Sequence, residues 1–287
     1  MRKGVVYPQI ELGGDVGAVR AFAQAAEDLG YDHFLMYDHV LGAEHAGREP
    51  ALWGPYTEKD PFHEPFISFA YLAGITRRLE FMTGVIVLPQ RQTALVAKQA
   101  ADLDLFSGGR LRLGVGAGWN WVEFDALEVG EHFARRGKRE EQQIELMRRL
   151  WTEELVSYDD GVHKVERANI LPRPERSIPI WLGGFSKVAF NRAVRIADGF
   201  LFSGRSQGEA VDVMKSMQDK LVENGRLEGF GFESICGLAD GVDAWHENCQ
   251  TWQAAGGTHV SVVTMGMGYK TVDEHIEAIR STAEVCN

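Results

Sequence analysis

The chain has 287 residues, of which 45% are hydrophobic, and a formal net charge of −11. This length suits a single large α/β domain, and the hydrophobic content is that of a globular protein with a sizeable core. The acidic balance argues against a general ligand for nucleic acid or for anionic membranes. Any anionic ligand must therefore be held by local geometry.

Cysteine use and the first residues indicate a compartment. The three cysteines, Cys236, Cys249 and Cys286, are odd in number and form no CxxC motif, which is typical of reduced thiols in a cytosolic protein. The first residues carry two charges but no apolar signal core. No stretch approaches the ~20 apolar residues that span a bilayer. We expect a cytoplasmic protein that has no membrane partner.

Eight strand-like runs occur along the chain, and a helix-like segment follows most of them. The predicted strands are 4–10, 33–37, 79–88, 111–115, 180–182, 199–202, 234–238 and 259–264. The predicted helices are 15–29, 63–75, 92–106, 138–151, 186–197, 208–223, 242–255 and 272–285. This alternation, with no linker or shift in composition, predicts one α/β domain over residues 1–287, a (β/α)8 TIM barrel. A doubly wound sheet is the alternative.

Three segments interrupt the alternation. A long polar and aromatic loop, 40–61, follows the second strand, and a second loop covers 116–133. Segment 155–171 alternates about the turn residues Asp160-Gly161, which predicts a small hairpin inserted into the barrel.

Small residues gather where the predicted strands end, and this is the end of a parallel barrel that binds ligands. Gly84 inside the third strand indicates either a bulge that brings the backbone close to a ligand or simple core packing. The glycine-rich run 114–118 lacks the spacing of a phosphate-binding loop. We interpret it as a loop that lets a ring system approach the backbone.

The ends of the fifth and sixth strands predict an anion site. Gly183 and Gly184 precede Ser186, which can cap the next helix, so free N–H groups and the helix dipole would face the barrel mouth. An ordinary capped turn is the alternative. Neighbouring positions add small and basic residues: Lys187, Ser203, Gly204 and Arg205.

Asp38 and His39 end the second strand, and a carboxylate beside an imidazole suits proton transfer near neutral pH. A structural pair is the alternative. Aromatic residues of the predicted loops either line a pocket or cover the core: Trp53, Tyr56, Phe62, Trp119, Trp121 and Phe124. No second histidine stands at ligand spacing from His63, so we expect no metal.

Four motifs carry a family resemblance: TGVIVLP, LVAKQAADLDLFSGGRLRLGVGAGWNWVEFDAL, FARRGKREEQQIELMRRLW and PIWLGGFSKVAFNRAVRIADGF. From about Gly30 to Gly204 the chain resembles the bacterial luciferase-like flavin and deazaflavin oxidoreductases. The GVGAGWN form is similar to the branch that uses coenzyme F-420, a deazaflavin. The resemblance implies a (β/α)8 barrel, a cofactor ring at the carboxyl ends of the strands, and a homodimer.

The resemblance also implies roles for matching residues. A bulge with a non-proline cis peptide behind the ring would fall at Gly84-Val85, and Asp38 and His39 match a polar pair near the ring. His39 would donate or accept a proton. The loop near the ring would hold Ala117, Gly118 and Trp119, and the tail-binding turn Gly183, Gly184 and Phe185. From their position at the neighbouring strand end we add Ser203, Gly204 and Arg205 to the cofactor-binding residues.

The substrate pocket above the ring would be lined by Trp53, Phe62 and Trp119. Trp119 stands where some family members have a glutamate, which argues against transferring a sugar-phosphate substrate to this chain.

Four functions follow as hypotheses. The leading one is hydride transfer between coenzyme F-420 and a small organic substrate. The others are an FMNH2-dependent monooxygenase that uses oxygen and a non-catalytic cofactor-binding protein. A phosphate-binding barrel such as an aldolase would need a lysine at a strand end, and none of the predicted strand ends has one.

Overall fold

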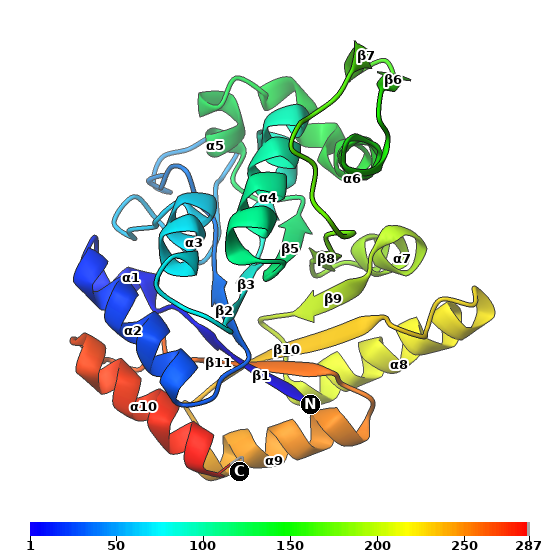
Figure 1. The fold of residues 1–287 in the computed structure, drawn as a ribbon. Helices are drawn as coiled ribbons and strands as arrows, with labels where there is room; N and C mark the ends of the chain where they lie inside the picture. The colour runs from blue at the N-terminus through cyan, green and yellow to red at the C-terminus, as the bar shows by residue number, and fades with distance from the viewer. Residues whose placement is uncertain (286–287) are drawn as a thin grey trace.

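The computed structural model describes residues 1–285, and its centre is a closed barrel of parallel strands surrounded by helices (Figure 1). Every neighbouring pair of barrel strands is parallel, and the pairing of β3 with β5 closes the ring. The strands are β1 (Arg2–Val6), β2 (His33–Met36), β3 (Glu80–Thr83), β4 (Ile86–Val87), β5 (Leu111–Gly116), β8 (Ile180–Gly183), β9 (Gly199–Phe202), β10 (Gly231–Gly237) and β11 (His259–Val263). Since β3 and β4 share one position, the predicted eight-stranded barrel is confirmed.

Helices cover the outside of the barrel. The helices are α1 (Gln9–Leu12), α2 (Val16–Asp28), α3 (Pro65–Ala73), α4 (Thr93–Ser107), α5 (Trp121–Ala126), α6 (Arg136–Thr152), α7 (Lys187–Ile196), α8 (Gln207–Glu223), α9 (Gly241–Ala254) and α10 (Val272–Val285), with short 3-10 turns η1 (Leu88–Gln90) and η2 (Gly130–Arg135). The first and last long helices, α2 and α10, contact each other, so both ends of the chain take part in closing the domain.

The predicted hairpin is confirmed. Strands β6 (Val156–Asp159) and β7 (Lys164–Ala168) pair antiparallel and form a separate two-stranded sheet. In Figure 1 this hairpin projects beyond α6, away from the barrel axis.

Three boundaries differ from the prediction. The first strand ends at Val6, and residues 9–10 of the predicted strand belong to α1 instead, because Pro8 cannot donate a ladder hydrogen bond. The loop predicted over 116–133 contains α5 and η2. The seventh barrel strand begins at Gly231, three residues before the predicted start. The glycines around its first residues had indicated a loop there.

The third strand is broken by one additional residue. Phe81 pairs with Leu111 on β5, whereas Ile86, past the break, pairs with Val115. The offset between the two strands therefore changes from 30 to 29. At the break, the peptide bond between Gly84 and Val85 is cis, as the family resemblance implied.

Two groups of apolar side chains form the core. A large cluster lies between the barrel and its helices, and a smaller one fills the barrel interior. The interior cluster consists of Val6, Leu35, Met82, Trp181 and Leu201. The barrel is thus a packed core, and any ligand must bind at one of its ends.

Two sequence predictions concern thiols and membranes. Cys236 and Cys249 are buried and form no disulfide, while Cys286 lies outside the described residues. Among residues 1–285, no helix is long and apolar enough to cross a bilayer.

Candidate functional site

An apolar layer covers the barrel interior at the carboxyl ends of the strands. Its members are partly buried and pack on the interior cluster: Tyr37, Val85, Ile235, Val263 and Met265. They lie near the carboxyl ends of β2, β10 and β11 and at the break between β3 and β4. These side chains stay partly exposed, so they form the floor of a site at the mouth of the barrel.

Val85 belongs to this floor because the strand break turns it inward. A Cβ on Gly116 would come within 2.5 Å of the Val85 side chain, and one on Gly183 within 3.0 Å. Gly84 itself presses on Leu35, since a Cβ there would lie 2.1 Å from a Leu35 methyl group. At Gly84 the structure thus shows the core packing that was the alternative interpretation, and contact of its backbone with a ligand stays a prediction.

Asp38 holds the strand break in place. One carboxylate oxygen accepts from the backbone N–H of Val87 at 2.9 Å, and the other pairs with Arg91 at 2.7 Å. Arg91 also pairs with Glu64, the N-cap of α3. Burial raises the pKa of Asp38, and Arg91 opposes this effect. Both oxygens of Asp38 are thus committed to the protein, and its predicted contact with a cofactor stays a prediction.

His39 forms a hydrogen-bonded pair with Glu123 at the start of α5. The His39 Nδ1 atom lies 3.2 Å from the Glu123 carboxylate, which also accepts from the N–H groups of Val40 and Leu41 and from Gln90. Burial would raise the pKa of Glu123, but the hydrogen bond and charge of His39 and the two backbone N–H groups lower it below its usual range. Glu123 is therefore ionised at neutral pH.

This pairing fixes the protonation pattern of the imidazole. An ionised carboxylate can only accept, so His39 Nδ1 carries the hydrogen and neutral His39 presents Nε2 as an acceptor. Nε2 has no hydrogen-bond partner in the described part of the chain, and the side chain keeps 9% exposure. His39 can thus exchange a proton with a molecule at the mouth.

Three aromatic rings surround His39 edge-on. Tyr56, Phe62 and Trp119 place their ring centroids 5.5, 4.9 and 5.6 Å from that of the imidazole. Of the predicted pocket aromatics, Phe62 and Trp119 are thus brought to His39. Trp53 is 79% exposed, and its place in a pocket stays a prediction.

Tyr37 spans the mouth from β2 toward the opposite side of the barrel. Its hydroxyl lies near the side chain of Ser203, which follows β9. Burial, followed by the nearby Tyr56, raises the pKa of Tyr37. Tyr37 therefore remains a neutral phenol that closes the floor of the site.

The glycine-rich loop after β5 lies against the strand break. Gly118 has φ +74°, a left-handed conformation that favours glycine, and a Cβ there would lie 2.4 Å from a Val87 methyl group. Its carbonyl accepts from Arg136 at 3.0 Å. The loop, the break and the first turn of α6 are thus packed as one unit, with Ala117 and Trp119 at the mouth side of it.

The turn after β8 has the predicted cap. The Ser186 side chain accepts from the N–H of Ala189 at the start of α7. Arg205 donates to the carbonyl of Phe185 and so joins this turn to the one after β9. Phe185 is 66% exposed. The structure brings the predicted tail-binding residues together, while their contact with a cofactor stays a prediction.

The sequence interpretation missed Glu123, Tyr37 and Arg91. The pattern Asn120-x-x-Glu123 resembles a helix capping box, and Asn120 does cap α5. The Glu123 side chain, however, turns to the loop after β2, 84 residues earlier. Only the pairing of an N3 glutamate with a strand-end histidine could have suggested the contact.

Two cavities in the described chain lie away from the mouth. One, of about 450 Å³, lies between η2, α6 and the hairpin turn. The other, of about 440 Å³, lies beside Trp181 and His259, at the opposite end of the barrel. Within residues 1–285 no cluster of three or more His, Cys, Asp or Glu side chains could hold a metal ion.

Comparison with known proteins gives one family. The luciferase-like monooxygenase family matches residues 3–279. Among curated relatives, an uncharacterised protein of Mycobacterium tuberculosis is 33% identical over 221 residues, which cover 74% of each chain.

Relatives with assigned activities differ in the cofactor that their names give. An F-420-dependent glucose-6-phosphate dehydrogenase of Gordonia bronchialis is 31% identical over 206 residues, covering 70% of this chain and 55% of that protein. An FMNH2-dependent dimethylsulfone monooxygenase of Pseudomonas putida is 28% identical over 238 residues, covering 81% and 61%. The chain thus aligns with little more than half of the length of these two proteins.

A solved F-420-dependent secondary alcohol dehydrogenase, in complex with an F-420–acetone adduct, superimposes with a TM-score of 0.79 over 100% of this chain and 99% of that one. A monooxygenase from Streptomyces bottropensis gives 0.75 over 99% and 98%. Sequence identities of 14% and 19% mean that these likenesses support the fold alone.

Proposed function

We propose, since the chain belongs to the luciferase-like monooxygenase family, that it is an oxidoreductase that transfers a hydride between coenzyme F-420 and a small organic substrate. The carrying observation is the mouth of the barrel, where the break at Gly84-Val85 and the free Nε2 of His39 lie around one apolar floor. Hydride transfer is the chemistry that a bound deazaflavin supplies.

The mouth residues fit a flat ring. Val85 and its neighbours give a partly exposed apolar floor, and the glycines at 116 and 183 leave no side chain above it. A ring that rests on this floor would lie within reach of the side-chain layer that carries His39 and Trp119. The turn after β8, together with Arg205, supplies backbone N–H groups and one cation toward an anionic tail.

The residues of the chain have separate roles in this proposal. Glu123 fixes the tautomer of His39, so that Nε2 can accept a proton from a substrate hydroxyl or return it to a carbonyl. The rings of Phe62 and Trp119 exclude water from the same side of the site and present an apolar wall to the substrate. This arrangement suits the oxidation of an alcohol or the reduction of a ketone-like group.

The alternative, an FMNH2-dependent monooxygenase, uses the same barrel. It is favoured by relatives such as the dimethylsulfone monooxygenase, which covers more of this chain than the dehydrogenase does. We place F-420 first because the GVGAGWN motif resembles that branch. A non-catalytic cofactor-binding protein would leave the free acceptor on His39 without a purpose.

An anaerobic titration separates these functions. The purified full chain is titrated with reduced F-420 and, separately, with FMNH2, and bound cofactor is followed by absorbance. We expect binding of F-420 at micromolar concentration and turnover with a panel of small alcohols. Micromolar binding of FMNH2 with no binding of F-420 would reverse the order, and tight binding of F-420 without any turnover would favour the non-catalytic protein.

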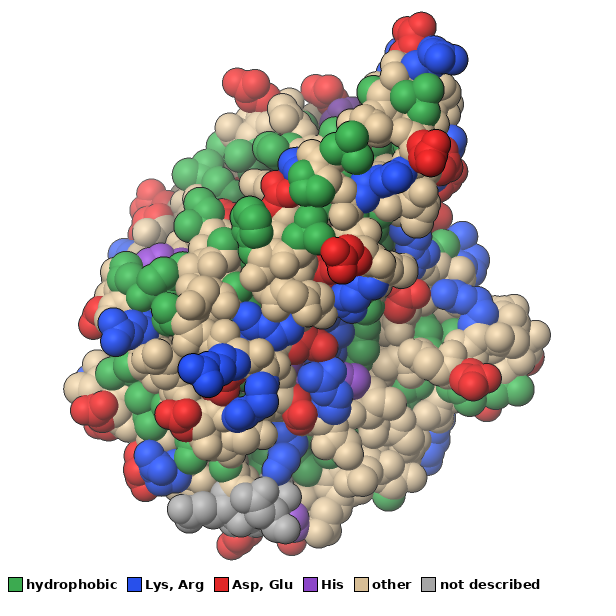
Figure 2. Space-filling model, in the orientation of Figure 1, with side chains coloured by type: hydrophobic (Ala, Val, Ile, Leu, Met, Phe, Trp, Pro, Cys, Tyr) green, Lys and Arg blue, Asp and Glu red, His purple; other side chains and the backbone are tan. Residues whose placement is uncertain are grey.

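We also propose that the chain forms a homodimer. Large apolar side chains are exposed on the adjacent helices α3 and α4: Ile67, Tyr71, Leu95 and Phe106. Figure 2 shows hydrophobic side chains at the surface over this part of the molecule. Such a surface is unusual on a monomer. Sedimentation velocity of the wild type and of an Ile67→Glu variant would test it, since the charged side chain should release monomers.

A further inference from the structure

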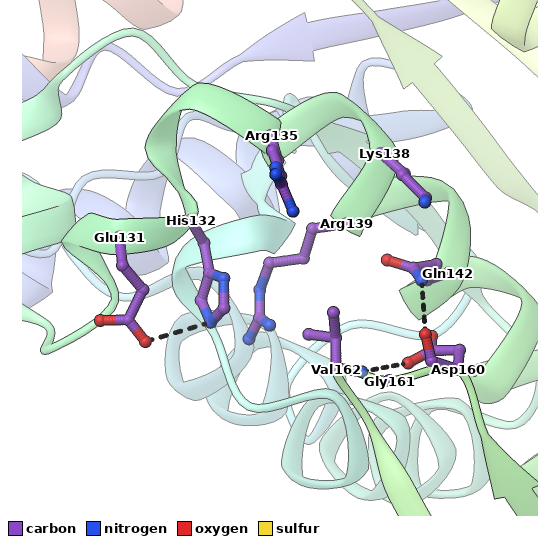
Figure 3. Close-up of a pocket in the computed structure, with 9 residues that line it drawn as sticks. All are labelled: Glu131, His132, Arg135, Lys138, Arg139, Gln142, Asp160, Gly161 and Val162. Carbon is purple, nitrogen blue, oxygen red and sulfur yellow. Dashed lines mark hydrogen bonds and ion pairs between the residues drawn. The ribbon is translucent and has the colours of Figure 1, made fainter.

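The cavity between η2, α6 and the hairpin turn has a basic lining that the proposed function does not use. Its wall consists of Glu131, His132, Arg135, Lys138, Arg139, Gln142, Asp160, Gly161 and Val162. Figure 3 shows His132 and Arg139 reaching into the same space, opposite the turn of the hairpin. At about 450 Å³ it can hold a small organic molecule.

Arg139 is the buried cation of this cavity. Its side chain belongs to a residue that is only 8% exposed, and its Nε donates to the carbonyl of Pro89 at 3.0 Å. That bond aims the guanidinium and leaves its two terminal nitrogens without a hydrogen-bond acceptor within residues 1–285. Figure 3 places these nitrogens inside the cavity. A buried guanidinium without a carboxylate partner is energetically unfavourable unless an anion joins it.

The other cations of the cavity are also without ion-pair partners. Neither Arg135 nor Lys138 lies within 4 Å of a carboxylate in the described chain, and both are exposed at its rim. Burial, followed by the charge of Arg139, lowers the pKa of His132. A positive potential inside the cavity is consistent with this effect, in a protein whose net charge is −11.

The two acids of the cavity do not neutralise it. Asp160 uses its carboxylate inside the hairpin, where it accepts from the N–H groups of Val162 and His163 and from the His163 ring and the Tyr158 hydroxyl. Glu131 has 76% of its side chain exposed and lies 3.6 Å from the ring of His132, whose lowered pKa favours the neutral form. The basic groups are therefore left for a ligand.

We propose that this cavity is a binding site for a small oxyanion, a compound with phosphate or clustered carboxylate groups, separate from the site at the barrel mouth. Arg139 would bind it with both terminal nitrogens, a geometry that suits the two oxygens of a phosphate or a carboxylate. Arg135 and Lys138 would add charge at the rim. The proposal does not depend on which cofactor binds at the mouth.

The test uses calorimetric titration of the full chain in its native oligomeric state, without divalent metal, with pyrophosphate and separately with citrate. We expect saturable binding of at least one, and Arg139→Gln should weaken it by about tenfold or more. Binding of pyrophosphate alone assigns a phosphate compound, and binding of citrate alone assigns a polycarboxylate.

Two further variants distinguish a loss of anion binding from a loss of the fold. Arg135→Gln combined with Lys138→Gln changes only exposed residues and should weaken binding by about tenfold, with an unchanged circular dichroism spectrum. Arg149→Gln removes one positive charge from the same helix outside the cavity, so it should bind as the wild type does. Absence of saturable binding by either anion, or equal affinity in every variant, overturns the proposal.

Discussion

Two histidine–carboxylate pairs lie at opposite ends of β2, and their surroundings separate structure from function. At the amino end, His33 Nε2 lies 2.7 Å from Glu233, and both side chains are fully buried. Past the carboxyl end, His39 Nδ1 lies 3.2 Å from the buried Glu123, but His39 keeps some exposure. The same two residue types thus form a sealed pair and an open one.

The sealed pair belongs to a network of charges inside the barrel. The second oxygen of Glu233 pairs with Arg112 at 2.8 Å, and Arg112 also pairs with Glu80 and lies over the ring of Trp181. Burial would raise the pKa of Glu233, but His33 and Arg112 lower it well below the usual range. Here both carboxylate oxygens are bound by protein groups, and the unpartnered atoms that remain, His33 Nδ1 and one terminal nitrogen of Arg112, are buried away from any ligand.

The open pair differs in access and not in its hydrogen-bond pattern, since His33 Nδ1 also has no partner but is fully buried. Glu123 is saturated by protein donors, whereas His39 has one ring nitrogen without a partner. A buried histidine–carboxylate contact therefore indicates a functional site only where the second nitrogen of the imidazole faces a ligand-accessible space. Predictions that break one pair and spare the other test this distinction.

The largest effect is expected from Glu233→Ala. It leaves Arg112 and His33 buried with no carboxylate between them, and breaking a buried ion pair in this way costs ~3–5 kcal/mol. We expect the urea midpoint of unfolding to fall accordingly. Glu153→Ala, which breaks an exposed pair with Arg149, is the control and should leave the midpoint nearly unchanged. An equal midpoint in both variants would contradict the role of the network.

Replacing His39 should lower kcat and spare stability, whereas replacing His33 should lower stability and spare kcat. His39→Ala is expected to lower kcat by about 10²–10⁴-fold, the range of a lost acid–base group, with cofactor binding and the unfolding midpoint close to those of the wild type. His33→Ala should do the opposite, lowering the midpoint but not the kcat of the folded protein. Steady-state kinetics and urea unfolding of the pair decide it, and normal turnover by His39→Ala removes His39 from the mechanism.

A third buried carboxylate, Glu140, should make the free energy of unfolding depend on pH. Glu140 on α6 pairs with Arg192 through one oxygen, while the other has no partner in the described chain. Burial raises its pKa to about 7. The unfolded chain then loses this proton first, so Glu140 lowers the free energy of unfolding as pH rises from about 4.5 to 7.

Glu140→Gln removes this dependence. Its free energy of unfolding, relative to that of the wild type, should rise by ~2–3 kcal/mol between pH 4.5 and pH 8. Urea unfolding at four pH values measures it. Glu153→Gln is the matched control, and parallel pH curves for Glu140→Gln and the wild type would show that Glu140 is ionised throughout.

The smallest effect is expected from Glu123→Gln. The amide oxygen can still accept from His39, but the charge is lost, and we expect kcat to fall about tenfold with little change in cofactor affinity. In a His39→Ala background the same change should have no further effect on kcat. A further loss in that background would mean that Glu123 acts on the fold and not through His39.

The fold could be predicted because its signals are local. Apolar runs such as 111–115 end in small residues, helices follow, and the turn at Asp160-Gly161 marks the hairpin, so each barrel unit is visible within some 40 residues. The motif TGVIVLP placed the break at Gly84-Val85 through family resemblance. The end of the first strand, residues 9–10, was one exception, because so short a segment does not distinguish a strand from a helix.

The site was harder because its contacts join distant segments. Glu123 meets His39 across 84 residues, and Arg91 meets Asp38 across 53. The hydrophobic periodicity of the sequence does not indicate contacts between residues so far apart. Asp38 and His39 were identified by position alone, which could not reveal that Asp38 spends both oxygens on the protein while His39 keeps one nitrogen free.

The additional residue in the third strand has a consequence for which side chains the ligand meets. In an unbroken strand that keeps every residue, alternation from Met82 would point Ile86 into the barrel; because the break absorbs one residue, Ile86 packs outward beneath the helices and Val85 takes an inward place. Straightening this segment without removing a residue would thus invert inside and outside from Val85 to Pro89, whereas deleting Gly84 would keep Val85 inside and Ile86 outside. The break that absorbs the extra residue therefore decides which side chains of this strand face a ligand at the mouth of the barrel.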